Sequence, residues 1–370
     1  MTGSSPPRIA LAVHHLAPAG GLEQHALRLA AILARRGAAV TMITTRASAD
    51  PPAGIRIERI SPRGHTNHGR LAAFAEDAAR AAAGRFDRTV AFHAIPGFDA
   101  IFCADPSRAA PRGRRRWLPR HRAYADLERR ALASGDGPVL LLSSAQLEAF
   151  AANHPAARSR LRLLAPTVDR LKAQPAAATA AARSDARQSL GLEPDAAVWL
   201  WMGLQPKTKG LDRTLRALAA TPTARLVVCG LEQTSRAARP PLVLARRLGV
   251  ADRVLWLGFA SEAALAEAMA AADLLLHPSR ADVTGTVILE ALASGLPVIT
   301  TAICGYGEHV AEADAGVVLP EPFDPGALHQ ALAAAAPETL ARWSANALAY
   351  AGRDALYSGL GQAAELILSR

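Results

Sequence analysis

The chain has 370 residues that are 50% hydrophobic and 5% aromatic, and its 42 lysines and arginines against 32 acids give a net charge of +10. This length and apolar content allow a large buried core and predict two domains, while the excess of positive charge favours anionic partners. Three distant cysteines, Cys103, Cys229 and Cys304, argue against a disulfide framework or a structural zinc site, and no apolar stretch is long enough to span a membrane.

The first apolar segment, RIALAVHHL from Arg8 to Leu16, predicts a strand and not a signal peptide, because the run is short and contains two histidines. Gly20 and Gly21 follow it, and the next segment, LEQHALRLAAILARRG, is typical of a helix. Backbone without side chains could approach a ligand at these glycines, with the helix start facing an anion, although a simple turn is the competing interpretation. We therefore expect a cytosolic protein.

Strand-like and helical segments then alternate along the whole chain, which is typical of parallel α/β architecture. The first series of strands comprises AVTMITT, IRIERI, DRTVAF and PVLLLSS. A segment rich in proline and alanine, residues 166–185, marks the edge of a domain. A second series follows with the strands AAVWLWMG, ARLVVCG, RVLWLG, DLLLHPS and AGVVLP. Two doubly wound halves would leave a cleft between them, where ligands gather at the carboxyl ends of the strands.

A basic segment from Arg108 to Arg122, RAAPRGRRRWLPRHR, contains seven arginines and no acid. A charge run of this kind is most often a solvated loop. Here Trp117 and Leu118 lie inside the run, a combination that fits insertion at the headgroup boundary of an anionic membrane. Nucleic acid is the competing partner, but no nucleic-acid fold signature accompanies the segment.

Two lysines, Lys207 and Lys209, follow a strand of the second series in the stretch MGLQPKTKG. Exposed lysines usually serve only solubility, but two ammonium groups at the mouth of a cleft can neutralise a pyrophosphate without a metal.

The stretch RADVTGTVILEALASGLPVITT, residues 280–301, carries two acids on either side of a predicted helix start. Thr284 to Thr286 begins this helix, which Gly295 and Pro297 stop. Its free N–H groups and its dipole make an anion site. Glu290 lies one turn inside the helix and Asp282 in the loop before it. Spacing alone would favour a surface acid and a turn residue.

The two acids separated by seven residues, the KG pair about seventy residues upstream and the early Gly-Gly loop together resemble the retaining GT-B glycosyltransferases of family 4. A narrower resemblance covers essentially the whole chain and points to the lipopolysaccharide core glucosyltransferase I group, the WaaG or RfaG type. Its residues are HTNHGR (65–70), PGFD (96–99), AADLLLHP (271–278) and TTAICGY (300–306).

The resemblance implies a GT-B fold, an α/β architecture of two doubly wound Rossmann-like domains facing a central cleft. Residues 1–170 would form the acceptor-side domain and residues 186–340 the nucleotide-sugar domain. Helices in residues 341–370 would cross back to the first domain.

The resemblance also assigns roles to individual residues. Glu290 would accept hydrogen bonds from the ribose, Asp282 would face the transferred sugar, and Lys209 would bind the diphosphate. The implied donor site comprises Gly20, Gly21, Lys207, Lys209, Gly285, Thr286, Val287 and Glu290. The implied catalytic residues are Asp282, Lys209 and Asp99, and the implied acceptor-side residues are His65, Asn67, His68 and Arg70. No DxD-type motif is present, so we expect no metal cofactor.

The sequence departs from the family pattern in two places. The first acid is normally Glu, and Asp282 is shorter by one methylene. An arginine normally lies near the catalytic lysine, but Leu204 and Thr208 fill its expected positions, which leaves Lys207 as the substitute. Both changes affect the donor sugar and phosphate, so they leave the identity of the sugar open.

The resemblance implies a retaining enzyme that moves a hexose, glucose from UDP-glucose, onto an inner-core heptose of lipopolysaccharide at the cytoplasmic face of the inner membrane. The leaving diphosphate would act as the base, and the protein would supply positioning and charge stabilisation. A UDP-sugar 2-epimerase of the same fold, a transferase with another nucleotide sugar and a non-catalytic binding protein are the alternatives. Incubation with a UDP-sugar alone separates an epimerase from a transferase, because only the epimerase changes the sugar.

We predict that the basic segment binds anionic vesicles, with Trp117 inserted as a wedge. Each basic residue near such a surface contributes about 1 kcal/mol, so several together suffice for attachment that salt weakens. Exchange of the arginines for glutamine should abolish co-sedimentation with anionic vesicles and leave UDP binding intact; the exchanged residues are Arg112, Arg114, Arg115, Arg116 and Arg120. Equal binding to neutral and anionic vesicles would contradict this prediction.

Overall fold

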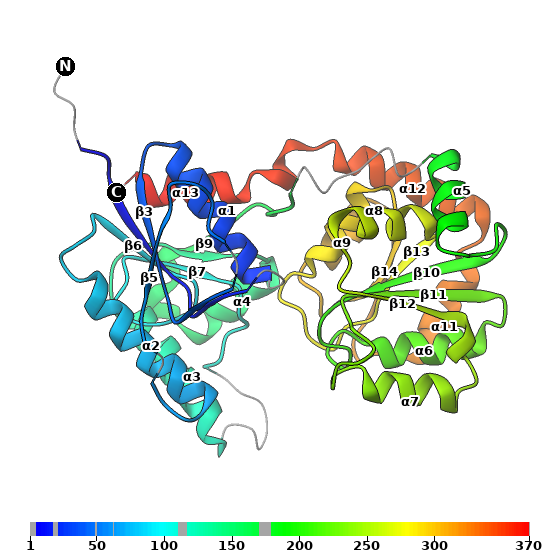
Figure 1. Ribbon diagram of the computed structural model, residues 1–370, viewed down its shortest axis with the longest axis horizontal. Helices are drawn as coiled ribbons and strands as arrows, with labels where there is room; N and C mark the ends of the chain where they lie inside the picture. Colours follow the sequence, from blue (N-terminus) through cyan, green and yellow to red (C-terminus); the bar gives the residue numbers. More distant parts are fainter. Residues whose placement is uncertain are drawn as a thin grey trace. The chain divides into compact units, whose positions relative to one another are not determined.

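The computed structural model describes residues 5–17, 21–48, 50–61, 63–109, 117–169 and 179–369. The chain divides into two compact units, each assembled around its own sheet (Figure 1). Unit 1 comprises Met1–Thr167 and Tyr357–Arg370, and unit 2 comprises Val168–Leu356.

Unit 1 contains a seven-stranded sheet in which all paired strands are parallel, in the order β5-β3-β1-β6-β7-β8-β9. Its strands are β1 (Arg8–Ala12), β3 (Ala39–Thr44), β5 (Arg56–Arg59), β6 (Arg88–Ala91), β7 (Ala100–Cys103), β8 (Val139–Leu141) and β9 (Leu161–Leu163). Two short strands, β2 (His15–Leu16) and β4 (Arg46–Ala47), pair separately. The predicted first strand is therefore shorter than its apolar run, and His14 lies beyond the end of β1.

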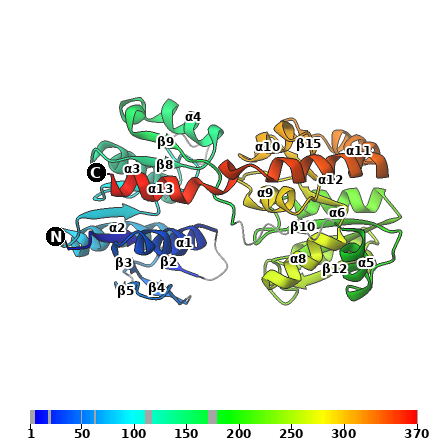
Figure 2. The ribbon, with the colours of Figure 1, turned by 90° about the horizontal axis from the view of Figure 1, so that it is seen from above.

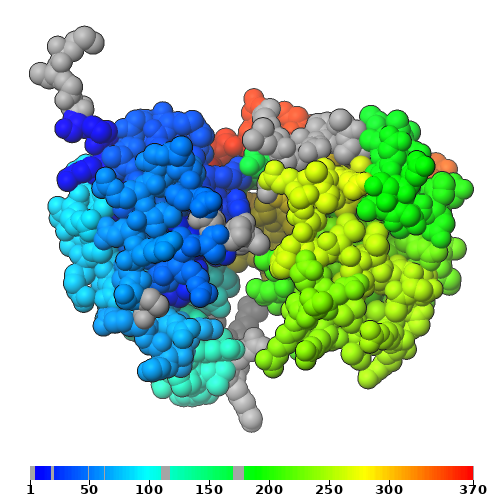
Figure 3. Space-filling model, in the orientation of Figure 1, coloured from blue at the N-terminus to red at the C-terminus, as the bar shows by residue number. Residues whose placement is uncertain are grey.

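Helices cover both faces of this sheet because successive strand residues point to opposite sides. Ile9 and Leu11 of β1 pack with α1 and α13, whereas Ala10 and Ala12 pack with α2 and α3. The helices of unit 1 are α1 (Gly21–Arg35), α2 (Asn67–Ala82), α3 (Pro119–Ala133), α4 (Ser144–Asn153) and α13 (Gly359–Leu368). α2 and α3 lie side by side and form one continuous surface of unit 1 (Figure 3).

The C-terminal helix α13 lies beside α1, so the end of the chain completes the first unit (Figures 1 and 2). Helix α12 (Pro337–Ala351) instead packs on α9 (Thr286–Ala293) of unit 2. The chain therefore joins unit 1 at Tyr357, later than the expected boundary at residue 341.

Unit 2 contains a six-stranded parallel sheet in the order β12-β11-β10-β13-β14-β15. Its strands are β10 (Ala197–Met202), β11 (Ala224–Cys229), β12 (Val254–Gly258), β13 (Leu274–His277), β14 (Val298–Thr301) and β15 (Gly316–Leu319). Its remaining helices are α5 (Ala180–Ser189), α6 (Leu211–Ala220), α7 (Arg239–Arg247), α8 (Glu262–Ala271), α10 (Gly307–Glu312) and α11 (Pro325–Ala334). Trp199 and Trp201 of β10 pack against α6, α7 and α11, and α8 and α9 contact strands from the other face (Figure 1). Both sheets confirm the predicted α/β class.

A buried arginine ties α5 to the amino ends of two strands. The Arg187 side chain is only 2% exposed and forms an ion pair with Asp273 at 2.8 Å. Its guanidinium also donates to the carbonyl groups of Ala271, Pro194 and Ala196. Asp273 in turn accepts the Val198 N–H at 2.8 Å, so the pair connects β10 with the segment before β13.

We predict that Arg187→Met lowers the free energy of unfolding of unit 2 by on the order of 3–5 kcal/mol, because it removes the donor to three carbonyl groups and the buried charge partner of Asp273. Arg183→Met is the matched control, since Arg183 also pairs with Asp273 but is 43% exposed. Its loss should cost less than about 1 kcal/mol. Urea unfolding followed by tryptophan fluorescence reports mainly on unit 2, because four of the five tryptophans lie there: Trp199, Trp201, Trp256 and Trp343. Equal losses in the two variants would contradict the prediction.

Candidate functional site

The candidate site of unit 2 forms where three neighbouring strands end. β10, β13 and β14 are adjacent in the sheet and parallel, so the loops after them begin at the same edge. These loops carry Lys209, Asp282 and Cys304, and the last residue of β13 is His277. Parallel α/β sheets commonly bind ligands at this edge.

Close backbone contact positions Lys209. The next residue, Gly210, has a φ of 76° and begins α6, and a Cβ on it would lie 2.0 Å from the carbonyl oxygen of Pro278. Only glycine allows the loop after β10 to approach the loop after β13 this closely. The Trp201 indole N–H also donates to the Lys209 carbonyl at 3.0 Å. The lysine therefore extends from a backbone that is held on both sides.

The Asp282 carboxylate is the centre of this site, because three donors from different parts of unit 2 converge on it. The Lys209 ammonium lies 2.5 Å from Oδ2, and His277 Nε2 lies 2.9 Å from the same oxygen. The Gly285 N–H donates to Oδ1 at 3.0 Å. The sequence predicted both Lys209 and Asp282 as site residues but did not predict that they pair.

These donors keep Asp282 ionised. Burial alone would raise the pKa of its carboxyl group, but the hydrogen bond from His277 and the charge of Lys209 outweigh burial and lower the pKa to about 2. Because the folded pKa is depressed, the stabilisation is complete above the ordinary carboxyl pKa and is lost only as the pH falls toward 2. The site thus holds a fixed negative charge at neutral pH.

His277 is a functional candidate that the sequence analysis missed. Its side chain is 1% exposed, and Ser279 Oγ lies 3.1 Å from the same Nε2 that bonds Asp282. The Thr300 hydroxyl donates to the His277 carbonyl at 3.0 Å, which ties the end of β13 to β14. The available signal was a histidine at the end of the otherwise apolar strand LLLH.

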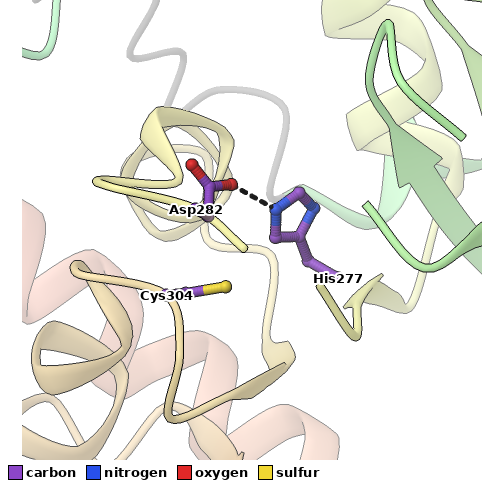
Figure 4. Close-up of side chains that lie close together, drawn as sticks. All are labelled: His277, Asp282 and Cys304. Atoms are coloured by element: carbon purple, nitrogen blue, oxygen red, sulfur yellow. Dashed lines mark hydrogen bonds and ion pairs between the residues drawn. The ribbon is translucent and has the colours of Figure 1, made fainter. Parts of the chain in front are cut away.

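Cys304 completes a group that could, by its ligand types, hold a metal ion. A nitrogen of His277, an oxygen of Asp282 and the sulfur of Cys304 lie within 4.8 Å of one another, and the three side chains come from separate segments (Figure 4). Metal binding needs deprotonated ligands. Burial raises the pKa of the Cys304 thiol, and the Asp282 charge raises it further. Since Lys209 and His277 also bond the Asp282 oxygen, the geometry fits a metal-free ion pair better than a metal site.

The predicted helix start is confirmed. Gly285 adopts the left-handed conformation, with a φ of 77°, and α9 begins at Thr286 without an acidic residue in its first turn. The first N–H groups of a helix have no intrahelical partner, and the dipole makes this end positive. The backbone of Thr286 and Val287 therefore offers donors for an anion. Glu290 lies one turn further along α9 and is partly buried.

Arg280 is a second residue that the sequence analysis missed. Its guanidinium pairs with both oxygens of Asp212 at 2.7 Å and donates to the Lys207 carbonyl at 2.7 Å. It thereby connects the loops after β10 and β13. Lys207 contributes its carbonyl to this connection, and its own side chain is exposed.

Unit 1 has a pocket of its own at the carboxyl edge of its sheet, with a volume of about 370 Å³. Basic and polar side chains dominate its lining: His14, His15, Asn67, Arg70, Leu71, His93, Ala94, Asp105, Arg108, Tyr124, Leu127 and Glu128. Of the four expected acceptor-side residues, Asn67 and Arg70 line this pocket, whereas His65 and His68 do not. For the other residues of the lining, the sequence offered two signals: the adjacent histidines His14 and His15, and Arg108 at the start of the basic segment.

Asp99, which was expected to be catalytic, lies away from the pocket of unit 1. This residue precedes β7, so it lies at the amino end of the sheet, opposite to the pocket. Its carboxylate accepts the Thr89 N–H at 2.8 Å and the Thr89 hydroxyl at 2.9 Å. The Asp99 N–H donates back to the Thr89 hydroxyl at 2.9 Å. Asp99 therefore joins β6 to β7. It is not among the residues that line the pocket.

The remaining predicted residues belong to neither site described above or lie outside the described ranges. Gly21 is the first residue of α1, Trp117 is 62% exposed, and Arg120 lies exposed in the first turn of α3. The predicted residues outside the described ranges are Gly20, Arg112, Arg114, Arg115 and Arg116. In the part of the chain that the structure describes, no helix is both long and apolar enough to cross a membrane.

Known proteins resemble this chain over most of its length. A family model described as "Glycosyl transferases group 1" matches residues 182–349. The lipopolysaccharide glucosyltransferase WaaG of Escherichia coli (strain K12) is 32% identical over 377 residues, which cover 97% of this chain and 98% of that protein. The D-inositol 3-phosphate glycosyltransferase of Mycobacterium marinum is 29% identical and matches 84% of this chain and 74% of its own length.

The solved structures extend this similarity to the fold. The crystal structure of WaaG, described as a glycosyltransferase involved in lipopolysaccharide biosynthesis, matches with a TM-score of 0.88 and 31% identity. The match covers 98% of this chain and all of that structure, so both units have counterparts there.

Proposed function

The chain belongs to the group 1 glycosyltransferases, and we propose that it transfers glucose from UDP-glucose, with retention, to a heptose of the lipopolysaccharide inner core. The observation that carries the proposal is the Asp282, Lys209 and His277 cluster beside the open N-terminus of α9. A fixed carboxylate, an ammonium group and a positive helix end within one site suit a reaction in which a diphosphate leaves a sugar. The similarity to WaaG supports the choice of acceptor.

The donor site in this proposal is built on unit 2. The N–H groups at the start of α9 and the Lys209 ammonium bind the diphosphate, and exposed Lys207 adds a second positive charge. Glu290, one turn inside α9, accepts hydrogen bonds from the ribose hydroxyls. Such an arrangement needs no divalent cation, because backbone dipoles and ammonium groups supply the positive charge.

Asp282 provides the catalytic electrostatics. Positive charge develops on the sugar as the glycosidic bond breaks, and a carboxylate that stays ionised stabilises it. Hydrogen bonds from His277 and from the Gly285 N–H hold this carboxylate in place. Its side chain is only 9% exposed, so solvent screens its charge little. The Lys209 ammonium bonds Asp282, so in this proposal it links the carboxylate that faces the sugar with the diphosphate. The leaving diphosphate accepts the proton of the attacking hydroxyl on the same face.

The proposed cellular location is the cytoplasmic face of the inner membrane. The basic segment around exposed Trp117 supports attachment to anionic lipid, and the lipid-linked nature of a lipopolysaccharide acceptor requires an enzyme at a membrane surface. The direct test of the whole proposal is a panel of UDP-, GDP- and ADP-sugars with truncated lipopolysaccharide as the acceptor. Transfer from UDP-glucose alone is the expected result, and conversion of the free UDP-sugar without transfer would refute it.

The two acids should respond differently to removal of their charge. We predict that Asp282→Asn lowers kcat by about 10²–10³-fold, because one preorganised electrostatic partner of the transition state is lost. UDP affinity should stay the same or increase, because the variant releases Lys209 from its ion pair. Glu290→Gln should instead raise KM for the donor, since a ribose contact acts in ground and transition states alike. Steady-state kinetics with both substrates varied gives these constants. Native turnover by Asp282→Asn with every sugar donor would show that Asp282 only stabilises the loop.

UDP should bind without a divalent cation. Calorimetry in excess chelator is expected to give the same affinity as in magnesium, and Lys209→Ala should weaken binding by on the order of tenfold through loss of a charge-assisted hydrogen bond. Arg246→Ala, an exposed basic residue of α7 in the same unit, is the control and should leave the affinity unchanged. Strict dependence on magnesium or manganese would refute the metal-free account.

A further inference from the structure

The pocket of unit 1 contains two acids, and both bond other groups of the protein. Asp105 bonds His93 Nδ1 at 3.1 Å and Arg108 at 3.3 Å. Burial alone would raise the pKa of Asp105, but His93 and Arg108 outweigh it and lower the pKa to about 2. Asp105 is therefore ionised, and its negative charge is balanced by its contacts with Arg108 and His93.

The second acid, Glu128, is 2% exposed and fully engaged. It accepts the Ser107 hydroxyl at 2.7 Å and the N–H groups of Arg108 and Ala109 at 2.7 and 3.1 Å. His154 Nε2 lies 2.8 Å from Oε1 on the remaining side. Two carboxylates that would otherwise bind sugar hydroxyls thus serve to hold the loop after β7.

The donors of the pocket, in contrast, are largely unused. Arg70 employs only its Nε, which donates to the Gly64 carbonyl at 3.1 Å. Within the described part of the chain, the Arg70 terminal nitrogens, the Asn67 amide and the Tyr124 hydroxyl have no hydrogen-bond partner. His14 Nε2 is buried and likewise unpartnered among the described residues. The pocket therefore presents unpartnered polar groups that include the two terminal N–H groups of Arg70.

Within the described lining, Arg70 carries a positive charge that no acid pairs with, whereas Asp105 pairs with Arg108 and Glu128 bonds His154. Burial, together with the charges of His15, His93 and Arg70, lowers the pKa of His14 to about 4. Asn67 and Arg70 lie in the first turn of α2, which contains no acid, so the positive end of the helix dipole adds to the potential. A pocket with an arginine that no acid pairs with, beside the N-terminus of a helix, favours an anion.

We propose that this pocket binds a phosphate group carried by the acceptor, with Arg70 as its main charged contact. The inference rests on the proposed function in that the phosphate belongs to the molecule that receives the sugar. Both acids of the pocket already bond groups of the protein, whereas the two terminal nitrogens of Arg70 are unused. A phosphate only accepts hydrogen bonds from cations, amides and hydroxyls, which is what the unused groups provide.

Inorganic phosphate is the direct probe, and the full-length protein labelled with 15N-histidine is the sample. Titration at constant ionic strength should shift the imidazole signals of His14 and His15 saturably, because the anion lies beside them. His329 of α11, in unit 2, should not move and serves as the internal reference. A parallel titration with acetate should require a clearly higher concentration, since a carboxylate carries less charge and fewer acceptor atoms.

Two matched arginine variants on α2 test the assignment to Arg70. Arg70→Gln should weaken phosphate binding and raise KM for the phosphorylated acceptor, each on the order of tenfold, as expected for a charge-assisted contact. KM for the sugar donor should not change. Arg80→Gln, near the other end of α2, removes an exposed arginine that pairs with Asp77 and should leave all three quantities unchanged. Removal of the phosphate from the acceptor should abolish the difference between Arg70→Gln and the wild type.

Several results would overturn the inference. These are the absence of phosphate-dependent shifts at His14 and His15, equal affinity for acetate, or unchanged phosphate binding by Arg70→Gln. A rise in donor KM and not in acceptor KM would assign the pocket to the diphosphate of the donor. Failure of the proposed function is distinguishable, because saturable phosphate binding without any sugar transfer would refute the glycosyltransferase proposal and leave the phosphate site supported.

Discussion

The Asp282 carboxylate is the interaction on which the arrangement of the candidate site depends. Lys209, His277 and the Gly285 N–H reach it from the loops and strand ends around β10 and β13. Without the carboxylate, an ammonium group and a buried imidazole would lie side by side with no opposite charge between them. The ion pair therefore fixes where the lysine lies and, through Gly285, where the N-terminus of α9 opens.

The parallel sheet explains why both units place their polar groups at one edge. Every strand in a parallel sheet ends on the same side, so the loops after successive strands collect there although they are distant in sequence. In unit 2 this edge carries the Asp282 carboxylate with Lys209 and His277 around it. In unit 1 it carries the pocket in which Asp105 and Glu128 are satisfied by the protein itself. The same architecture thus yields two sites of different chemistry.

The short side chain of Asp282 has a direct structural consequence. A carboxylate one methylene closer to the backbone lies against His277 and Gly285, where it is held from two sides and is only 9% exposed. The carboxylate of a glutamate at this position would extend further from the loop. The Arg280 pair with Asp212 reinforces this close packing, because it binds the neighbouring loop to the same segment.

The sequence by itself determined the elements that depend on local chemistry. Alternating apolar segments predicted the strands, and Gly285, Gly295 and Pro297 predicted the limits of α9, because backbone conformation at such residues is set locally. Only the tertiary structure decided which polar side chains meet. It paired Lys209 with Asp282, brought His277 to the same carboxylate oxygen, and placed Asp99 at the edge opposite to the pocket of unit 1. Such contacts depend on the order of the strands in the sheet and on the strand end at which a residue lies. The spacing of residues along the chain determines neither of these.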